Sequence, residues 1–379
     1  SGLVFDNGIK AVDSSFALGD VQISSTAKPP ASEFRSGSEA SIVKWEGLGR
    51  QGRRFVGRGP TGAQIAEFTG RPALEPIRAY AGTANAEEVE DRAALAVDDL
   101  VRAGGFERSN LMVAGSTGSG FIEPSASNSF EYLTGGDSAI VSIQYSHLPS
   151  WASFVVDQTA ARNAGRALFD EVYERWLKLP VDSRPKLYIF GESLGSFAME
   201  TAFSGEADLR NRTSGALFVG PPNFNELYSE FRANRAAGSR EIEPVFRNGR
   251  TIRFTNNPWE SIPPTTQPWN DPRMLYLVHP SDPITWWSPD LIWHEPDWLK
   301  EPRGDDVSPS MRWYPIVTFW QTSADMAVAM ATPPGHGHNF VGEHVAGWNQ
   351  VLQPADWTEA DLVRLHAQWS DGAAECPGV

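Results

Sequence analysis

Short blocks of apolar residues alternate along the chain with longer stretches in which apolar and polar positions follow a helical period. The blocks around Ile77–Tyr80 and in NLMVAGS, SAIVSIQYS, KLYIFGES, GALFVGPP and MLYLVHPSD are apolar at nearly every position, which is typical of strands buried on both faces. Between them, stretches such as NAEEVEDRAALAVDDLVRAGG and AARNAGRALFDEVYERWLKL predict amphipathic helices. Strands that alternate with helices in this way form a parallel sheet with helices on its faces. The pattern predicts an α/β fold with a mostly parallel, doubly wound sheet.

Two parts of the chain depart from this alternation. Residues 1–70 are rich in Gly, Ser and Pro and predict an irregular N-terminal extension, in which RFVGRGPTGAQIAEFTG forms a short strand, a turn and a helical turn. Residues 284–335 are rich in Trp and Pro and predict a cap that lies over the end of the sheet. The remaining chain, residues 71–379, is expected to form one α/β domain that includes this cap.

The composition excludes several classes of function. The formal net charge is −15 and the pI is about 5.0, so the chain repels nucleic acid and no nucleic-acid partner is expected. The single cysteine, Cys376, allows neither a disulfide framework nor a cysteine-based zinc site. No run of about 18 apolar residues occurs, so this stretch of chain is expected to be soluble by itself. Neither a cofactor nor a metal is expected.

The stretch YIFGESLGSFAME carries the first indication of chemistry. It places Ser193 between a predicted strand and a predicted helix, in the pattern G-x-S-x-G formed with Gly191 and Gly195. Glycines at these positions leave room for a sharp turn that exposes the serine hydroxyl, as in a nucleophile elbow. The backbone N–H of Leu194, at the start of the helix, then faces a developing oxyanion. The alternative interpretation is a tight strand–helix turn without chemistry.

A serine nucleophile in such a fold requires an acid and then a histidine later in the chain. Asp282 follows the apolar strand of MLYLVHPSDPITWW, although an aspartate before proline also serves as an ordinary turn cap. TPPGHGHNFVGEHVAGW offers two histidines before a final helix. We favour His338 as the base, because Gly-His-Asn-Phe resembles the G-H-x-F sequence often found around such histidines, and His336 is the alternative base.

Further residues are expected to complete the site. A second oxyanion N–H normally comes from the loop after the third strand, which here is the Gly-rich loop after NLMVAGS, so Thr117 or Gly118 is the predicted donor. Aromatic and histidine side chains near strand ends are expected to line the substrate pocket, or else only to pack the cap against the sheet. These residues are Tyr145, His147, Trp151, Trp286 and Trp287.

Several long and unusual segments resemble those of one branch of the α/β-hydrolases. They are GRRFVGRGPT, GGDSAIVSIQYSHLPSW, RPKLYIFGESLGS, HPSDPITWWSPDL, PDWLKEPRGDDVSPSMRWYPIVTFWQ and PPGHGHNF. The chain resembles a membrane-tethered bacterial family in which a multi-span membrane segment precedes an extracytoplasmic hydrolase domain. The resemblance implies Ser193 as nucleophile, Asp282 as acid and the GHGH loop as base. It also implies membrane helices upstream of Ser1, a location at the cell membrane, and lipid-linked or aminoacyl-lipid esters as substrates.

These features together predict a serine hydrolase that cleaves an ester through an acyl-enzyme. An acyltransferase would use the same triad, because the reactions differ only in whether water or another alcohol attacks the acyl-enzyme. An α/β-hydrolase scaffold used only for binding is a further interpretation. A metal hydrolase built on His336, His338, His344 and Asp282 is another, but it leaves the turn at Ser193 unexplained.

Overall fold

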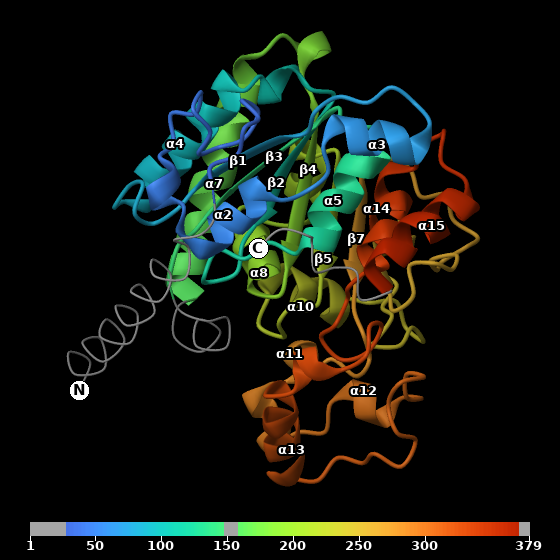
Figure 1. Cartoon of the computed structure of the whole chain (residues 1–379). Coiled ribbons are helices and arrows are strands. Elements are labelled where there is room, and N and C mark those ends of the chain that lie inside the picture. The colour runs from blue at the N-terminus through green and yellow to red at the C-terminus, as the bar shows by residue number, and fades with distance from the viewer. Residues whose placement is uncertain (1–27, 148–157, 371–379) are drawn as a thin grey trace, which may run out of the picture. The chain divides into compact units, whose positions relative to one another are not determined.

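The computed structural model describes residues 28–147 and 158–370, which divide into two compact units (Figure 1). The first unit ends at Ala202 and the second begins at Phe203. Among the described residues there are seven strands, four in the first unit and three in the second. Each unit is therefore described separately.

In the first unit the strands pair in parallel in the order β1-β3-β2-β4. Nearly every residue in these strands is buried, as their continuous apolar pattern predicts. Because β3 lies between β1 and β2, the chain crosses over between strands through helices. The strands are β1 (Ile77–Ala81), β2 (Asn110–Gly115), β3 (Ser138–Ile143) and β4 (Lys186–Glu192).

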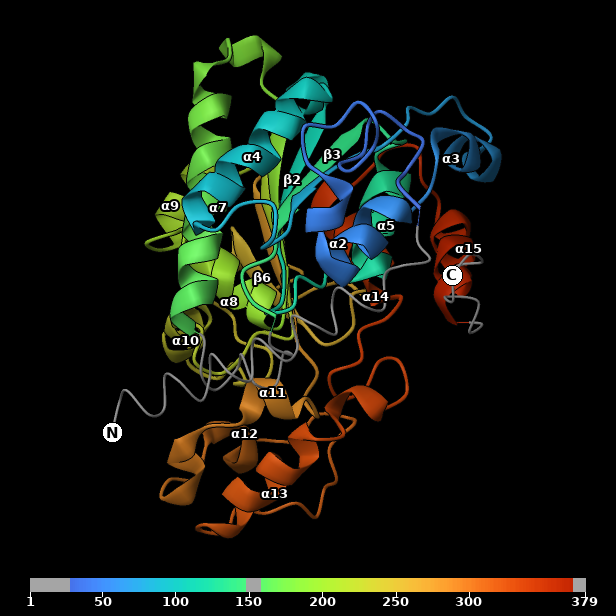
Figure 2. The ribbon, with the colours of Figure 1, turned by 60° about the vertical axis from the view of Figure 1, so that its left-hand side comes forward.

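Helices cover both faces of this sheet. Figure 2 shows α4 and α7 on one face and α2 and α5 on the other, which confirms the predicted doubly wound arrangement for this unit. Helix α8 packs on β4 and β2. The helices are α2 (Gly49–Gly57), α3 (Gly62–Thr69), α4 (Val89–Arg102), α5 (Pro124–Leu133), α7 (Gln158–Lys178) and α8 (Leu194–Glu200).

The second unit also contains parallel strands, in the order β5-β7-β6. They are β5 (Gly215–Val219), β6 (Ile252–Thr255) and β7 (Arg273–Leu277), and helix α14 packs on β5 and β7. Within the Trp- and Pro-rich segment, Figure 1 shows α11, α12 and α13 grouped together, away from β7 and α14 of the same unit. The helices are α9 (Glu206–Arg212), α10 (Glu226–Ala233), α11 (Pro283–Trp286), α12 (Asp297–Lys300), α13 (Val317–Met326), α14 (Glu343–Leu352) and α15 (Glu359–Ser370).

The segment before residue 70 differs from its prediction, because α2 and α3 replace the short strand and single helical turn. Three glycines lower the helix propensity of α2, but tertiary contacts override it. Phe55 and Val56 are buried, and the buried guanidinium of Arg35 donates to the backbone carbonyls of Val56 and Pro60. Helix α3 starts at a capping box in which Thr61 and Gln64 satisfy each other's backbone N–H groups.

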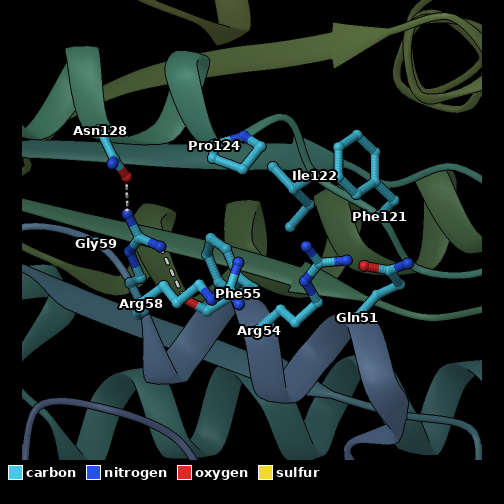
Figure 3. A pocket seen from close by; sticks show the side chains of 10 residues that line it. Gln51, Arg54, Phe55, Arg58, Gly59, Phe121, Ile122, Pro124 and Asn128 are labelled. Carbon is cyan, nitrogen blue, oxygen red and sulfur yellow. Dashed lines mark hydrogen bonds between the residues drawn. The ribbon is translucent and has the colours of Figure 1, made fainter. Parts of the chain in front are cut away.

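A small cavity lies beside α2, and the side chains of Gln51 and Arg54 extend from that helix along it (Figure 3). Arg78 of β1 also lines it, and its guanidinium forms an ion pair with buried Glu131 of α5 at 2.7 Å. The same guanidinium donates to Phe55 O at 2.7 Å and to Asn128 Oδ1 at 2.6 Å. These bonds satisfy a charge that is costly to bury, so Arg78 links β1, α2 and α5 within the first unit.

Candidate active site

Ser193 occupies a strained turn between β4 and α8. Its backbone has φ 53° and ψ −128°, a left-handed conformation that residues with a Cβ rarely adopt. Holding such a residue in this conformation typically costs about 1–3 kcal/mol. The conformation therefore persists only where the surrounding structure enforces it. The side chain is half-buried, and its backbone carbonyl accepts hydrogen bonds from Ser196. The sharp turn is therefore made by the serine itself.

The glycines of the G-x-S-x-G pattern serve close packing. A Cβ on Gly195 would lie 2.3 Å from the carbonyl oxygen of Gly115, and a Cβ on Gly191 would lie 2.5 Å from that of Gly195. Gly115 and Gly191 are also register partners in β2 and β4. Only glycine at these three positions lets the first turn of α8 rest directly on the two strands, with Ser193 at the carboxyl end of β4.

Two backbone N–H groups were predicted to form the oxyanion hole. Leu194 is the first residue of α8, so its N–H has no acceptor within the helix. In the loop after β2, the N–H of Thr117 already donates to Phe121 O at 3.0 Å. Gly118 accepts from the N–H of Ser146 at 3.0 Å, and its own N–H has no acceptor among the described residues. Of the two predicted loop donors, Gly118 is the one whose N–H is available.

In the second unit the structure brings Asp282 and His338 together. His338 Nδ1 lies 2.7 Å from Asp282 Oδ2, and both side chains are buried. Asp282 also caps α11: its Oδ1 accepts from the N–H of Ile284 at 2.8 Å, and its Oδ2 accepts from Thr285 Oγ1 at 3.2 Å. The Asp282 carboxylate therefore caps the turn and also contacts the candidate base, as each of its two interpretations predicts. Because Nδ1 donates to Asp282, the neutral ring carries its lone pair on Nε2, where a general base accepts a proton.

The neighbouring histidine has a different environment. The side chain of His336 is 54% exposed, and its Nδ1 lies 3.7 Å from Asp306 Oδ2. Asp306 Oδ2 also accepts a short hydrogen bond from Ser281 Oγ. Ser281 Oγ in turn accepts from the N–H of Gly337 at 2.8 Å. The two predicted candidates for the base are thereby distinguished: His338 pairs with the predicted acid, and His336 lies at the surface.

Three residues around His338 were not singled out from the sequence. Gly220 has φ 51°, and a Cβ there would lie 2.6 Å from Cε1 of His338. His279 and Glu343 form a second buried pair, in which His279 Nδ1 lies 2.9 Å from Gly337 O. The Gly-Pro-Pro turn after β5 is the only sequence signal for Gly220. His279 and Glu343 have none, because 64 residues separate them in the chain.

The predicted pocket residues occupy varied surroundings. In the first unit, Tyr145 and His147 are half-buried, and His147 Nε2 lies 3.0 Å from Thr83 Oγ1. In the second unit, Trp286 is fully buried, and its Nε1 donates to His279 O. Trp287 donates to Ser323 Oγ at 2.8 Å and therefore packs on α13. Trp151 lies outside the described residues.

Within residues 28–147 and 158–370, no group of three or more His, Cys, Asp or Glu side chains is arranged to hold a metal ion. His338 is committed to Asp282, and His344 is buried within α14. In the same part of the chain, no helix combines the length and apolar character required to cross a bilayer.

Comparison with known protein families gives two matches. A model described as the alpha/beta-hydrolase family matches residues 77–365, and a model described as the N-terminus of that family matches residues 1–60. The first match includes β1, the turn at Ser193, Asp282 and the loop of His338. No curated protein and no solved structure matches the chain.

Proposed function

Because the chain belongs to the alpha/beta-hydrolase family and has its fold, we propose that it is a serine hydrolase that cleaves an ester through an acyl-enzyme at Ser193. The observation that carries this proposal is the left-handed backbone of Ser193. A strand–helix turn without chemistry favours glycine at that position, because glycine adopts positive φ without strain. A serine held there at a cost supports a role that requires its hydroxyl.

The proposed reaction assigns one task to each residue. Ser193 Oγ attacks the carbonyl carbon of the ester, and its proton passes to Nε2 of His338. The C–O bond to the leaving alcohol then breaks, and His338 gives the proton to that alcohol. Water attacks the acyl-enzyme with His338 again as base, which releases the acid and regenerates Ser193. Asp282 keeps the proton on Nδ1 and stabilises the imidazolium, which the 2.7 Å bond between them supports.

The negative charge on the substrate oxygen requires donors that are in place before the reaction. We assign this role to the N–H groups of Leu194 and Gly118. Each such donor is typically worth about 3 kcal/mol of barrier. The N–H of Leu194 also lies at the positive end of the α8 dipole, which favours an anion.

For the substrate we propose a lipid-like ester, presented at a membrane surface. The support is the segment around α13, where large apolar side chains are exposed in an otherwise acidic chain. Tryptophan and tyrosine are the residues most suited to a boundary between water and lipid, because each has an apolar body and a polar tip. The exposed side chains are Trp293, Tyr314, Ile316, Val317, Trp320, Val328 and Met330.

A fluorophosphonate probe tests the proposed nucleophile directly, because it phosphonylates only an activated serine. We expect the wild-type chain to be labelled on a single residue and Ser193→Ala to be unlabelled. Ser183→Ala is the matched control, since Ser183 is an exposed serine just before β4 and its loss should leave labelling intact. Equal labelling of wild type and Ser193→Ala, with the modified peptide located elsewhere, would reject Ser193 as the nucleophile.

A further inference from the structure

A second buried pair of a histidine and a carboxylate lies beside the first. His279 follows β7 and is 1% exposed, and its Nε2 lies 2.8 Å from Oε2 of Glu343, the first residue of α14. Its Nδ1 lies 2.9 Å from the carbonyl oxygen of Gly337. A carbonyl oxygen can only accept a hydrogen bond, and an ionised carboxylate also only accepts. The contact with Gly337 therefore requires a proton on Nδ1, and a second proton on Nε2 turns the contact with Glu343 into a charge-assisted hydrogen bond of an imidazolium.

The charged groups around His279 agree with this protonation state. Burial lowers the pKa of His279, but the hydrogen bond to Glu343, the charge of Glu343, the Gly337 carbonyl and the charge of Asp282 outweigh it and raise the pKa above its ordinary value. Glu343 faces the ring from α14 and Asp282 from the start of α11. The Phe340 ring stacks on His279 with centroids 4.0 Å apart and meets His338 edge-on at 5.6 Å, so the titratable ring of His338 shares a neighbour with His279.

The peptide group that His279 binds is the one that leads into the base. The oxygen of the Gly337–His338 peptide accepts from His279, and the N–H of the same peptide donates to Ala329 O at 3.0 Å. Both polar atoms of this peptide are thus held, and its plane cannot rotate without breaking a buried hydrogen bond. The direction of the His338 side chain depends on that plane, because its Cα is part of the peptide unit.

We propose that the His279–Glu343 pair is a positioning device that holds the His338 loop in the geometry required for catalysis and releases it at alkaline pH. The inference rests on the proposed function of His338 as the base. His279 touches neither Ser193 nor the substrate in this scheme and acts only through the peptide of His338. Loss of a proton from His279 leaves a lone pair of electrons on Nε2 facing the Glu343 carboxylate. The two side chains then repel each other.

The sign of the pH effect follows from the raised pKa of His279. The pair contributes stability fully at pH values below the unfolded pKa of about 6.5, and this contribution is lost as the pH rises through the higher folded pKa. His338 must be neutral to act as a base, so activity also falls at acidic pH. The wild-type rate is therefore expected to be bell-shaped in pH, with the alkaline decline set by His279.

The test measures the rate of Ser193 labelling by a fluorophosphonate between acidic and alkaline pH. In Glu343→Gln the amide can donate to Nε2 of a neutral His279, which still donates from Nδ1 to Gly337. We expect this variant to lose the alkaline decline while its rate near neutral pH stays within about threefold of wild type. We expect His279→Gln to be slower by between about tenfold and a hundredfold over the whole range, because the base is misplaced. His366→Gln is the control, since His366 binds the carbonyl of Gly342 instead and should keep the wild-type profile.

A second measurement keeps the inference testable if Ser193 is not labelled. In wild type, the ring signals of His338 in a ¹⁵N NMR titration should shift as His279 loses its proton, and in Glu343→Gln this shift should be absent. Superimposable pH profiles for wild type, Glu343→Gln and His279→Gln would overturn the positioning role while leaving the nucleophile intact. Absence of labelling in wild type would instead reject the proposed function. If the NMR signals of His338 also stay unchanged while His279 loses its proton, the positioning role is rejected as well.

Discussion

Replacing Gly220 by alanine tests whether the position of the His338 ring matters for catalysis. The new Cβ would lie 2.6 Å from Cε1 and 2.9 Å from Nδ1 of His338, and 2.7 Å from the Phe340 ring. Ordinary contacts between carbon atoms are about 3.5–4.0 Å, so the ring must retreat by roughly 1 Å. Nδ1 is one of the crowded atoms, so the 2.7 Å bond to Asp282 is strained or broken.

Gly220→Ala is expected to lower both the folding stability and the catalytic efficiency. Alanine at φ 51° pays about 1–2 kcal/mol for the left-handed backbone, and crowding in a buried site adds about 1–3 kcal/mol to the loss of folding stability. A displacement of the base by about 1 Å is expected to lower kcat/KM about a hundredfold. Hydrolysis of a soluble p-nitrophenyl ester measures the loss of kcat/KM, and urea unfolding measures the loss of folding stability.

Gly238→Ala separates backbone strain from crowding. Gly238 has φ 87°, and a Cβ there meets nothing within 4 Å. We expect this variant to lose about 1–2 kcal/mol of stability and to keep its activity. Equal kcat/KM values for Gly220→Ala and Gly238→Ala would refute a catalytic effect of the close contact with His338.

Two further predictions concern the base and the substrate. His338→Gln should lower kcat about 10⁴-fold or more, whereas His336→Gln should change it less than about threefold, because His336 is exposed beside Asp306; the reverse order would identify His336 as the base. Trp293→Ser with Trp320→Ser should reduce hydrolysis of long-chain esters in vesicles at least about tenfold and leave hydrolysis of a soluble short-chain ester unchanged; equal losses on both substrates would count against a lipid-facing role.

Elements that bury a continuous apolar block could be predicted from the sequence. The strands β2, β3, β4, β5 and β7 and the helices α4, α7 and α14 all fall on segments with a clear period. Helices α2, α3 and α5 lack such a signal. In α2 the glycines weaken the local preference, and α5 is buried from Ser125 to Leu133, so its polar residues show no exposed face. Contacts with residues distant in the sequence determine these helices. A local hydrophobic pattern does not reveal such contacts.

The candidate site could be predicted to the extent that its residues follow strands in a fixed order. That order pointed to Ser193, Asp282 and the GHGH loop, but it did not separate His336 from His338. The separation depends on burial beside a carboxylate, which is a property of the folded chain. Gly118 over Thr117 is a similar case, because only the fold reveals that the N–H of Thr117 is already bonded to Phe121.

The two buried pairs explain why residue type alone could not assign their tasks. His279 precedes Asp282 by three positions, yet its carboxylate partner lies 64 residues away, whereas the histidine partner of Asp282 lies 56 residues away. The 2.7 Å contact with Asp282 involves Nδ1 of His338, and the proposed function assigns proton transfer to its Nε2. The proposed positioning role has His279 donate from both nitrogens, so that loss of a proton breaks the pair with Glu343. A nearby carboxylate is common to both histidines and therefore does not separate the proposed base from the proposed positioning residue, whereas the Gly337 carbonyl at Nδ1 of His279 does.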